Sequence, residues 1–491
     1  MNHWMLLFAV LFPMLAAIPL ALPQLRETRT RNAYVLTAVL LTSLGVLLLV
    51  ALPPDTHLAL VQLLDGVALT LRADGLSRVY AAIIALLWPA TAVYAFDYMG
   101  HERHQNRFYA FFLLSYGVAA GVAFSGNLVT MYLFFELLTL ATLPLVMHKM
   151  DDAARYAGKR YLIYSMTGAA LGLIGVVMAV NYGQPLDFTL GGTLDPAKVA
   201  GNEQTLRIAY TLAFFGFGVK AALLPMSFWL PAASVAPTPV TALLHAVAVV
   251  KAGAFACMRL TYYAFGTALL SGTTAQKVIL TATALTIVAG SGLALRNGHL
   301  KRRLAWSTVA NLSYILFGAA LMTDAGLVAA NLHMAAHALM KITLFFGVGA
   351  IMEKSGKSYI DELEGMAKRM PVTFSCMALA ALALTGVPPL PGFFSKWTLG
   401  EAAVSLGTPF AYLGMAALLI SAVLTALYMA TMLIPAFFPS SQLPREQGPN
   451  CETKPMNAVL LMLAAALVLL GLCMNGLTRL LSAWLVGGSA L

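Results

Sequence analysis

Long apolar blocks, each of about 18 to 25 residues, follow one another along almost the whole chain. An α-helix needs a block of this length to cross the ~30 Å hydrocarbon core of a bilayer. Only 10% of the 491 residues are charged and 60% are hydrophobic, whereas soluble domains carry about 25% charged residues. The sequence therefore excludes a soluble globular fold and predicts a single all-α polytopic membrane domain.

Polar residues and Gly/Pro punctuation divide the apolar blocks into about fourteen predicted transmembrane helices. The first block, from Met5 to Leu22, has no basic start and is followed by an arginine cluster. We therefore expect it to be retained as a span and not cleaved as a signal peptide. The predicted spans cover residues 4–22, 32–52, 76–97, 108–125, 127–148, 159–182, 206–235, 238–265, 276–296, 303–322, 326–353, 371–400, 409–438 and 456–486.

Lys and Arg residues are unevenly shared between alternate connections. One set of connections holds the basic clusters at 26–31, 103–107, 149–160, 296–303, 354–369 and 445–454. Basic residues of membrane proteins concentrate in cytoplasmic loops, so this set is expected in the cytoplasm and both termini on the outer side. The net charge of +10 then reports topology and predicts no nucleic-acid partner. The opposite connections and adjoining span ends hold only Arg72, Arg78, Lys198, Arg207, Arg259, Lys277 and Arg479.

Two predicted spans are interrupted by proline. Pro225 lies in the seventh span and Pro388 in the twelfth, and each of these spans also carries a lysine. Interrupted spans at matching places in two halves point to inverted repeats, because five spans separate them and an odd repeat reverses orientation. The alternative is that these are ordinary prolines, which membrane helices tolerate.

A few charges lie inside predicted spans and not in loops. Each costs about 2.5–3.5 kcal/mol near the centre of a membrane helix, so we expect these groups to be paired and functional. Snorkelling to the interface is the alternative for Lys396, and a purely structural ion pair is the alternative for Glu136. The intramembrane charges are Glu136, Lys220, Lys251, Lys341 and Lys396.

Histidines add to this pattern. His333, His337 and Lys341 are spaced four residues apart, which places them on one helical stripe about 12 Å long. Three protonatable groups on one face are typical of a proton relay. His245 and Lys251 share the eighth span and are expected to connect two neighbouring elements, although a lone buried histidine often has only a packing role.

Metal or haem binding is the competing interpretation of His333 and His337. The sequence lacks an HExxH motif and an evident third ligand. The four cysteines are far apart and form no CxxC pair, which predicts neither a disulfide framework nor an iron–sulfur site. We therefore expect no metal and no cofactor.

The intramembrane charges suggest a mechanism. Burial makes a lysine ammonium costly and a nearby carboxylate stabilises it. If Glu136 holds Lys220 charged in one state, separation of the two groups releases a proton. The predicted path then runs along His245 and Lys251 toward His333, His337 and Lys341, and finally to Lys396.

Short motifs around these charges resemble one family over residues 70–435. They are FFEL at 134–137, VKAA at 219–222, WLP at 229–231, PTPVTALLH at 237–245, VKAG at 250–253, KRRLAWST at 301–308, GVPP at 386–389 and FSKW at 394–397. With them the chain resembles the antiporter-like subunits of respiratory complex I, of Mrp cation/proton antiporters and of energy-converting membrane-bound hydrogenases.

The resemblance implies fourteen helices with two inverted five-helix repeats, broken in helices 7 and 12. It implies three N-terminal helices in residues 1–105, the repeats in 106–265 and 266–440, and a last helix in 441–491. Glu136, Lys220, Lys251 and Lys396 fall on the family's relay positions. The implied partners are other membrane subunits in the inner membrane of a prokaryote, with no redox centre in this chain. The residues around Lys251 and Lys396 favour an Mrp D-like or hydrogenase-linked subtype, and an N-type-like complex I subunit is the alternative.

The sequence thus predicts a subunit that translocates protons, or sodium ions in exchange for protons, within a larger complex. A stand-alone proton-coupled secondary transporter is the alternative, although the interrupted helices lack the polar surroundings expected of a solute site. A haem- or quinone-binding electron-transfer subunit is a third possibility.

Overall fold

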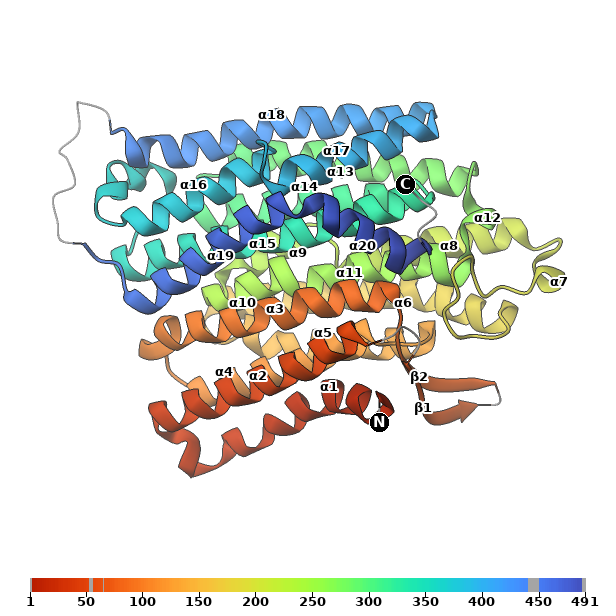
Figure 1. Ribbon diagram of the computed structural model, residues 1–491, viewed down its shortest axis with the longest axis horizontal. Coiled ribbons are helices and arrows are strands. Elements are labelled where there is room, and N and C mark those ends of the chain that lie inside the picture. Colours follow the sequence, from red (N-terminus) through yellow and green to blue (C-terminus); the bar gives the residue numbers. More distant parts are fainter. Residues whose placement is uncertain (1, 53–55, 65, 440–449, 488–491) are drawn as a thin grey trace.

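The chain forms a bundle of long helices that lie roughly side by side (Figure 1). The computed structural model describes residues 2–52, 56–64, 66–439 and 450–487. The predicted boundary between the second repeat and the last helix, at 440–441, lies outside these residues. The helices are α1 (Asn2–Ala16), α2 (Thr28–Ala51), α3 (Gly75–Tyr98), α4 (Gln105–Ala123), α5 (Leu128–Val146), α6 (Asp152–Tyr182), α7 (Pro196–Val199), α8 (Glu203–Gly218), α9 (Trp229–Ala232), α10 (Thr238–Ala242), α11 (Val249–Met258), α12 (Thr267–Leu270), α13 (Thr274–Arg296), α14 (Leu300–Ala320), α15 (Asp324–Ser355), α16 (Pro371–Thr385), α17 (Pro391–Leu406), α18 (Pro409–Phe437), α19 (Lys454–Leu472) and α20 (Met474–Val486).

The lengths and the apolar composition of its helices identify the chain as a multi-pass membrane protein. In the part of the chain that the structure describes, 10 helical segments are long and apolar enough to cross a bilayer. The short helices α7 and α12 and the β-hairpin lie at one end of the bundle (Figure 1). The start of α1 and the last turn of α20 point toward this same end.

One two-stranded hairpin makes the all-α prediction incomplete. Strands β1 (Thr56–Leu64) and β2 (Val67–Ala73) pair antiparallel between α2 and α3. The sequence between the strands reads Asp65–Gly66, and Gly66 has a φ of 79°. Asp-Gly between two β-prone segments is a strong hairpin signal, but these segments are shorter than a membrane span and a search for spans passes over them.

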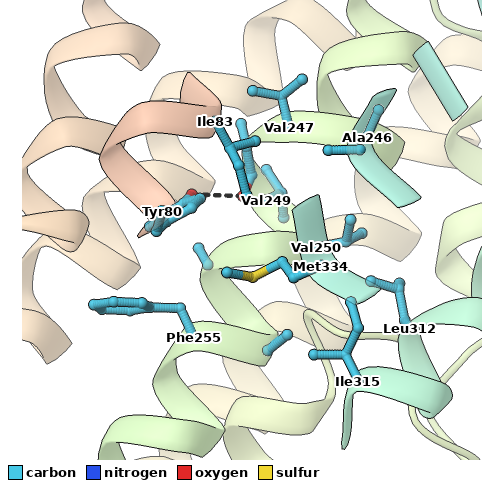
Figure 2. Packing of buried hydrophobic residues seen from close by; sticks show 14 of the residues in the cluster. Tyr80, Ile83, Ala246, Val247, Val249, Val250, Phe255, Leu312, Ile315 and Met334 are labelled. Carbon is cyan, nitrogen blue, oxygen red and sulfur yellow. Dashed lines mark hydrogen bonds between the residues drawn. The ribbon is translucent and has the colours of Figure 1, made fainter. Parts of the chain in front are cut away.

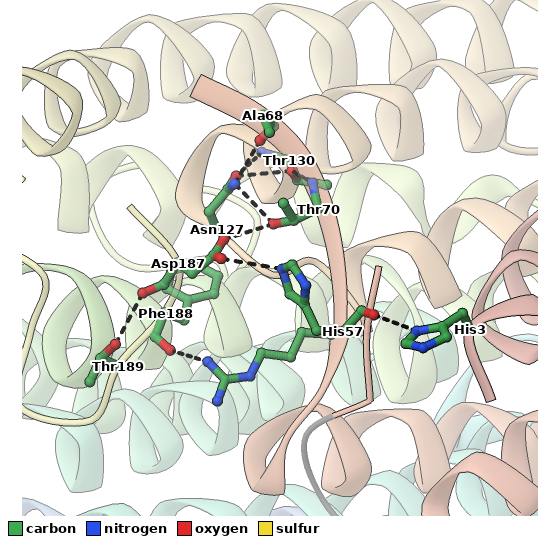
Figure 3. A network of polar contacts seen from close by, with 10 residues as sticks. His3, His57, Ala68, Thr70, Asn127, Thr130, Asp187, Phe188 and Thr189 are labelled. Atoms are coloured by element: carbon green, nitrogen blue, oxygen red, sulfur yellow. Dashed lines mark hydrogen bonds and ion pairs between the residues drawn. The ribbon is translucent and has the colours of Figure 1, made fainter. Parts of the chain in front are cut away.

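A polar network fastens the hairpin to the helical bundle (Figure 3). The Asn127 side-chain amide donates to the Ala68 carbonyl at 2.7 Å, and an Arg72 guanidinium nitrogen donates to the Phe188 carbonyl at 2.7 Å. His57 Nε2 lies 3.2 Å from Asp187 Oδ2. The hairpin therefore packs against both the start of α5 and the loop that follows α6.

The interior of the bundle is formed by α15 and by the helix that includes α10 and α11. The most apolar 18-residue stretch of α15 is 94% buried and that of the segment Thr238–Phe265 is 100% buried, against 33% for α6. Charged side chains on these two inner elements are therefore kept away from lipid by the other helices.

Both predicted interruptions are breaks in the helical backbone. The first lies between Gly218, at the end of α8, and Trp229, at the start of α9. The second lies between Thr385, at the end of α16, and Pro391, at the start of α17. Gly386 opens the second break at φ 101°, a conformation that glycine adopts without steric cost.

The span Thr238–Phe265 is also irregular, which the sequence prediction missed. Two π-helical segments, η5 (Leu243–Val247) and η6 (Arg259–Phe265), flank α11. Ala248, between η5 and α11, has φ −93° and ψ −88°. Its carbonyl accepts a hydrogen bond from the Tyr80 hydroxyl at 2.8 Å, within the apolar packing of α3, α11, α14 and α15 (Figure 2). A side chain from α3 therefore satisfies a carbonyl at the irregular turn.

Candidate functional site

The first predicted pair, Lys220 and Glu136, forms at the break between α8 and α9. Lys220 Nζ lies 3.4 Å from Glu136 Oε1, donates to the Phe135 carbonyl and sits 3.5 Å from the centre of the Phe135 ring. The Lys220 side chain is 1% exposed and that of Glu136 is 27% exposed. The ion pair thus joins α5 to the break, and its carboxylate is the more accessible partner.

Neighbouring elements hold the backbone of this break in place. The Trp229 indole nitrogen donates to the Val219 carbonyl at 2.8 Å, which satisfies an acceptor that the interrupted helix cannot use. A Cβ added to Gly253 of α11 would lie 2.4 Å from the Ala221 nitrogen. Because only glycine permits this approach, α11 packs directly against the break, two residues after Lys251.

Lys251 begins a second cluster in the centre of the bundle. Its Nζ is hydrogen-bonded to His337 Nδ1 on α15. The His337 and His333 rings stack with their centres 6.0 Å apart and an angle of 22° between their planes. Lys251, His333 and His337 are each 0% exposed, so the structure brings three of the predicted groups together away from lipid and water.

The cluster continues from α15 to the second break. His333 Nδ1 lies 3.0 Å from Ser395 Oγ on α17. The Tyr314 ring lies 5.1 Å from the His333 ring and 5.6 Å from Lys396 Nζ. Lys396 in turn donates to the carbonyls at the end of α16. A hydroxyl from α17 and an aromatic ring from α14 therefore connect the histidine pair to Lys396.

Lys396 is only partly buried. It lines a cavity of about 700 Å³ between α17 and α18, together with Trp397 and Glu401. Trp397 is 59% exposed and its indole nitrogen donates to Glu401 Oε1 at 2.7 Å. The lysine thus faces inward toward Tyr314 and outward toward this cavity.

Lys341 follows a separate branch, although it shares the helical stripe of His333 and His337. Its Nζ donates to Ser307 Oγ at 2.6 Å and to the Leu304 carbonyl at 3.2 Å, both on α14. Ser307 Oγ lies 2.5 Å from the Tyr428 hydroxyl of α18. Lys341 therefore leads toward α14 and α18 and not toward Lys396.

His245 lies in the π-helical segment η5, with its ring centre 4.8 Å from that of Phe345. Both of its ring nitrogens are buried, and neither has a hydrogen-bond partner among the residues described. It shares the span Thr238–Phe265 with Lys251, and Phe345 follows Lys341 by one turn of α15. His245 is therefore a polar group between the two branches.

Two features of the arrangement were outside the reach of the sequence prediction. Within residues 2–52, 56–64, 66–439 and 450–487, Lys220 and Lys251 are not linked by a direct hydrogen bond or ion pair. The connecting groups, which are the hydroxyls of Ser307 and Ser395 and the ring of Tyr314, were also missed, because such residues are common throughout the chain and only their contacts distinguish them. The described residues contain no cluster of three or more His, Cys, Asp or Glu side chains suited to a metal ion.

Comparison with known proteins identifies the family of this chain. The profile of the family described as NADH:quinone oxidoreductase/Mrp antiporter, transmembrane, matches residues 125–425. The chain belongs to this family. All eight predicted site residues, from Glu136 to Lys396, lie within the part that matches.

Relatives within the family are subunits of different complexes. The chain is 32% identical to NADH-quinone oxidoreductase subunit N of Desulforudis audaxviator over 82% of this chain and 81% of that protein. It is 33% identical to the A/B subunit of a probable K(+)/H(+) antiporter of Rhizobium meliloti over 67% of this chain and 32% of that protein. For hydrogenase-4 component B of Escherichia coli the identity is 31%, over 69% of this chain and 51% of that protein.

Solved structures agree with the family at the level of the fold. A chain of the membrane-bound sulfane sulfur reductase, an archaeal respiratory membrane complex, superposes with a TM-score of 0.84 at 23% identity over 97% of this chain and 96% of that chain. A chain of the Mrp complex from Dietzia sp. superposes with a TM-score of 0.83 at 25% identity, over 99% of this chain and 52% of that chain. The family fold therefore extends over nearly the whole chain.

Proposed function

We propose that the chain is an antiporter-like, proton-translocating component of a multisubunit membrane complex. The observation that carries this proposal is the series of buried titratable groups inside the family region, 125–425. Intramembrane charges are costly and mark ion pathways. Membership in a family whose relatives are subunits of complex I-like, Mrp and hydrogenase assemblies supports the same conclusion.

The proposed relay has two parts. In the first, Glu136 stabilises the ammonium form of Lys220, and loss of that contact makes release of the proton easier. In the second, the proton moves from Lys251 through His337 and His333 toward Lys396. The path follows the contacts between these side chains and the Tyr314 ring beside Lys396. Gly253 of α11 packs against the backbone of the first break, and movement at this contact couples the first part of the relay to the second.

The remaining predicted groups have supporting roles in this scheme. Lys341 exchanges protons with the hydroxyls of Ser307 and Tyr428. His245, which shares its span with Lys251 and whose ring contacts Phe345 one turn from Lys341, connects this branch to the main path.

We propose fourteen transmembrane spans with two inverted five-helix repeats at 106–265 and 266–440. Residues 1–105 supply three preceding helices and 441–491 the last. The placement of the two breaks, five predicted spans apart, supports the inverted relation. The distribution of basic residues supports both termini on the outer side of a prokaryotic inner membrane.

Proton transport by sealed vesicles tests the relay directly. We expect Glu136→Gln and Lys220→Ala each to lower the initial rate of proton movement by at least about tenfold, which corresponds to about 1.4 kcal/mol. The matched controls are Glu27→Gln and Lys198→Ala, which neutralise exposed groups and should leave the rate unchanged. Intact translocation in both relay variants, at equal protein levels, would refute the proposed path.

Native mass spectrometry after mild extraction tests whether the chain works within a larger complex. The expected result is that other membrane subunits remain attached to the chain. A homogeneous solitary protein that moves protons together with a solute would instead support the stand-alone transporter. The masses of the attached subunits would also identify the parent complex.

A further inference from the structure

A polar pocket lies away from the relay, between the start of α8 and the start of α13. Its volume is about 360 Å³, a size suited to a small ligand or headgroup. The polar lining groups are those of Gln204, Arg207, Thr211, Thr273, Thr274 and Lys277. None of these residues takes part in the contacts of the proposed proton path.

The pocket has the electrostatics of an anion site. Two cations, Arg207 and Lys277, line it together with threonine hydroxyls, and no Asp or Glu is among its described lining residues. Arg207 Nε donates to the Leu269 carbonyl at 3.0 Å, so the guanidinium is held in position. The nearby Glu203 carboxylate accepts the Gly201 backbone N–H at 3.2 Å and does not line the pocket.

The position of these cations is unusual for this molecule. Arg207 and Lys277 belong to the small set of basic residues at the end of the bundle opposite the basic loops. Arg259 of this set is paired with a carboxylate, whereas Arg72 and Arg207 each donate to a backbone carbonyl. Because basic residues are scarce here, two that converge on one pocket need an explanation.

An apolar surface adjoins the cationic pocket along the same two helices. Ile208 is 52% exposed, Leu212 38% and Val278 42%. Lys277 lies in the first turn of α13, within about 5 Å of the start of this candidate membrane span. Cations at a helix end beside exposed apolar side chains match the polarity of an amphiphile whose headgroup lies at the membrane interface.

We propose that this pocket binds the phosphate of an anionic phospholipid between Arg207 and Lys277, with an acyl chain along Ile208, Leu212 and Val278. Arg and Lys form charge-assisted hydrogen bonds with phosphate oxygens, and the threonine hydroxyls provide further donors. The lipid fills the groove between α8 and α13, next to the broken helix that carries Lys220. This site does not depend on the proposed transport function.

Lipid titration of the purified assembly, monitored by native mass spectrometry, tests the site. The probes are phosphatidylglycerol and phosphatidylcholine with identical acyl chains. We expect tighter binding of phosphatidylglycerol, and a loss of at least about tenfold in its affinity for the double variant Arg207→Gln/Lys277→Gln. The matched control, Lys198→Gln/Arg479→Gln, removes the same charge from the same end of the bundle outside the pocket and should bind as the wild type does.

Four other outcomes would contradict the proposal. Equal affinity for the two lipids, or an equal loss in both double variants, would overturn it. Displacement of the lipid by equimolar inorganic phosphate would assign the pocket to a soluble anion, and a neighbouring protein found to cover the pocket would assign it to a protein partner. If the double variant fails to fold, Lys277→Gln alone replaces it, because Lys277 is exposed, and about a threefold loss is expected.

Discussion

The two broken helices hold their lysines in different ways. In the first break, Lys220 Nζ lies 3.4 Å from the carboxylate of Glu136. At the second, Lys396 Nζ donates to the Leu384 carbonyl at 2.7 Å and to the Thr385 carbonyl at 3.0 Å. One lysine therefore faces a full negative charge on a neighbouring helix, and the other faces the dipoles at the end of α16.

The difference indicates a division of labour. A carboxylate on α5 can move away or take up a proton, so that its stabilisation of Lys220 can be removed. The carbonyls at the end of α16 belong to the backbone, and the negative end of a helix dipole favours a cation by a smaller amount that stays constant. The first break is thus suited to switching and the second to receiving a proton at a fixed site.

The largest expected effect comes from removing only the acid of the first pair. Glu136→Gln leaves the nearly inaccessible Lys220 ammonium without its opposite charge, and we expect a loss of about 3 kcal/mol in the free energy of unfolding. The double variant Glu136→Gln/Lys220→Met should recover most of this loss. Unfolding titrations in detergent measure both values, and additive losses would contradict a coupled pair.

Gly253→Ala tests the close packing of α11 on the first break. The added methyl group would meet the Ala221 backbone at 2.4 Å, so we expect about 2 kcal/mol of destabilisation from overpacking. Gly292→Ala on α13 is the matched control, because nothing lies within 4 Å of its added Cβ. Thermal unfolding of the two variants in detergent makes the comparison, and equal melting temperatures would show that the break tolerates displacement.

Lys396→Met should cost less stability than Glu136→Gln. The variant removes a cation but leaves no unpaired charge, and the carbonyls of Leu384 and Thr385 can bind water from the adjoining cavity. We expect about 1 kcal/mol of destabilisation, together with loss of proton transport in sealed vesicles. If the two variants cost the same in unfolding titrations, the proposed difference between the breaks is wrong.

The smallest expected effect is that of Ser395→Ala. It removes the hydroxyl 3.0 Å from His333 Nδ1, at a cost of about 1 kcal/mol or less. Transport should slow by about two- to fivefold, because the Tyr314 ring and Lys396 remain in place. Thr398→Ala, on the same helix, is the control, and vesicle transport at equal protein levels compares them. An unchanged rate for Ser395→Ala would exclude this hydroxyl from the path.

Local sequence properties are sufficient to predict a multi-pass helical membrane protein and the two breaks. The length of an apolar block sets whether a helix crosses a membrane, and proline near Lys220 or Lys396 disrupts backbone hydrogen bonding within a few residues. The family resemblance of the short motifs is confirmed by the match to residues 125–425. The roles of the individual relay residues and the domain boundaries stay predictions.

Contacts between helices could not be predicted in the same way. Helical spacing places Lys341 on one stripe with the two histidines, yet packing directs its amine to Ser307 of α14. The neighbours of a side chain depend on how α11, α14, α15 and α17 pack, and one sequence does not specify this. The hairpin was missed because its two strands are shorter than a membrane span, so that a search for apolar blocks passes over them.

The π-helical segment η5 limits how this protein can change over evolution. A π-helical turn is equivalent to an α-helix with one residue inserted. Deletion of one residue within Leu243–Val247 would therefore restore a regular α-helix and leave the flanking residues, Lys251 among them, in their present orientation. A single codon loss would leave the composition, hydropathy and charge of the chain almost unaltered while removing the widened turn that contains His245.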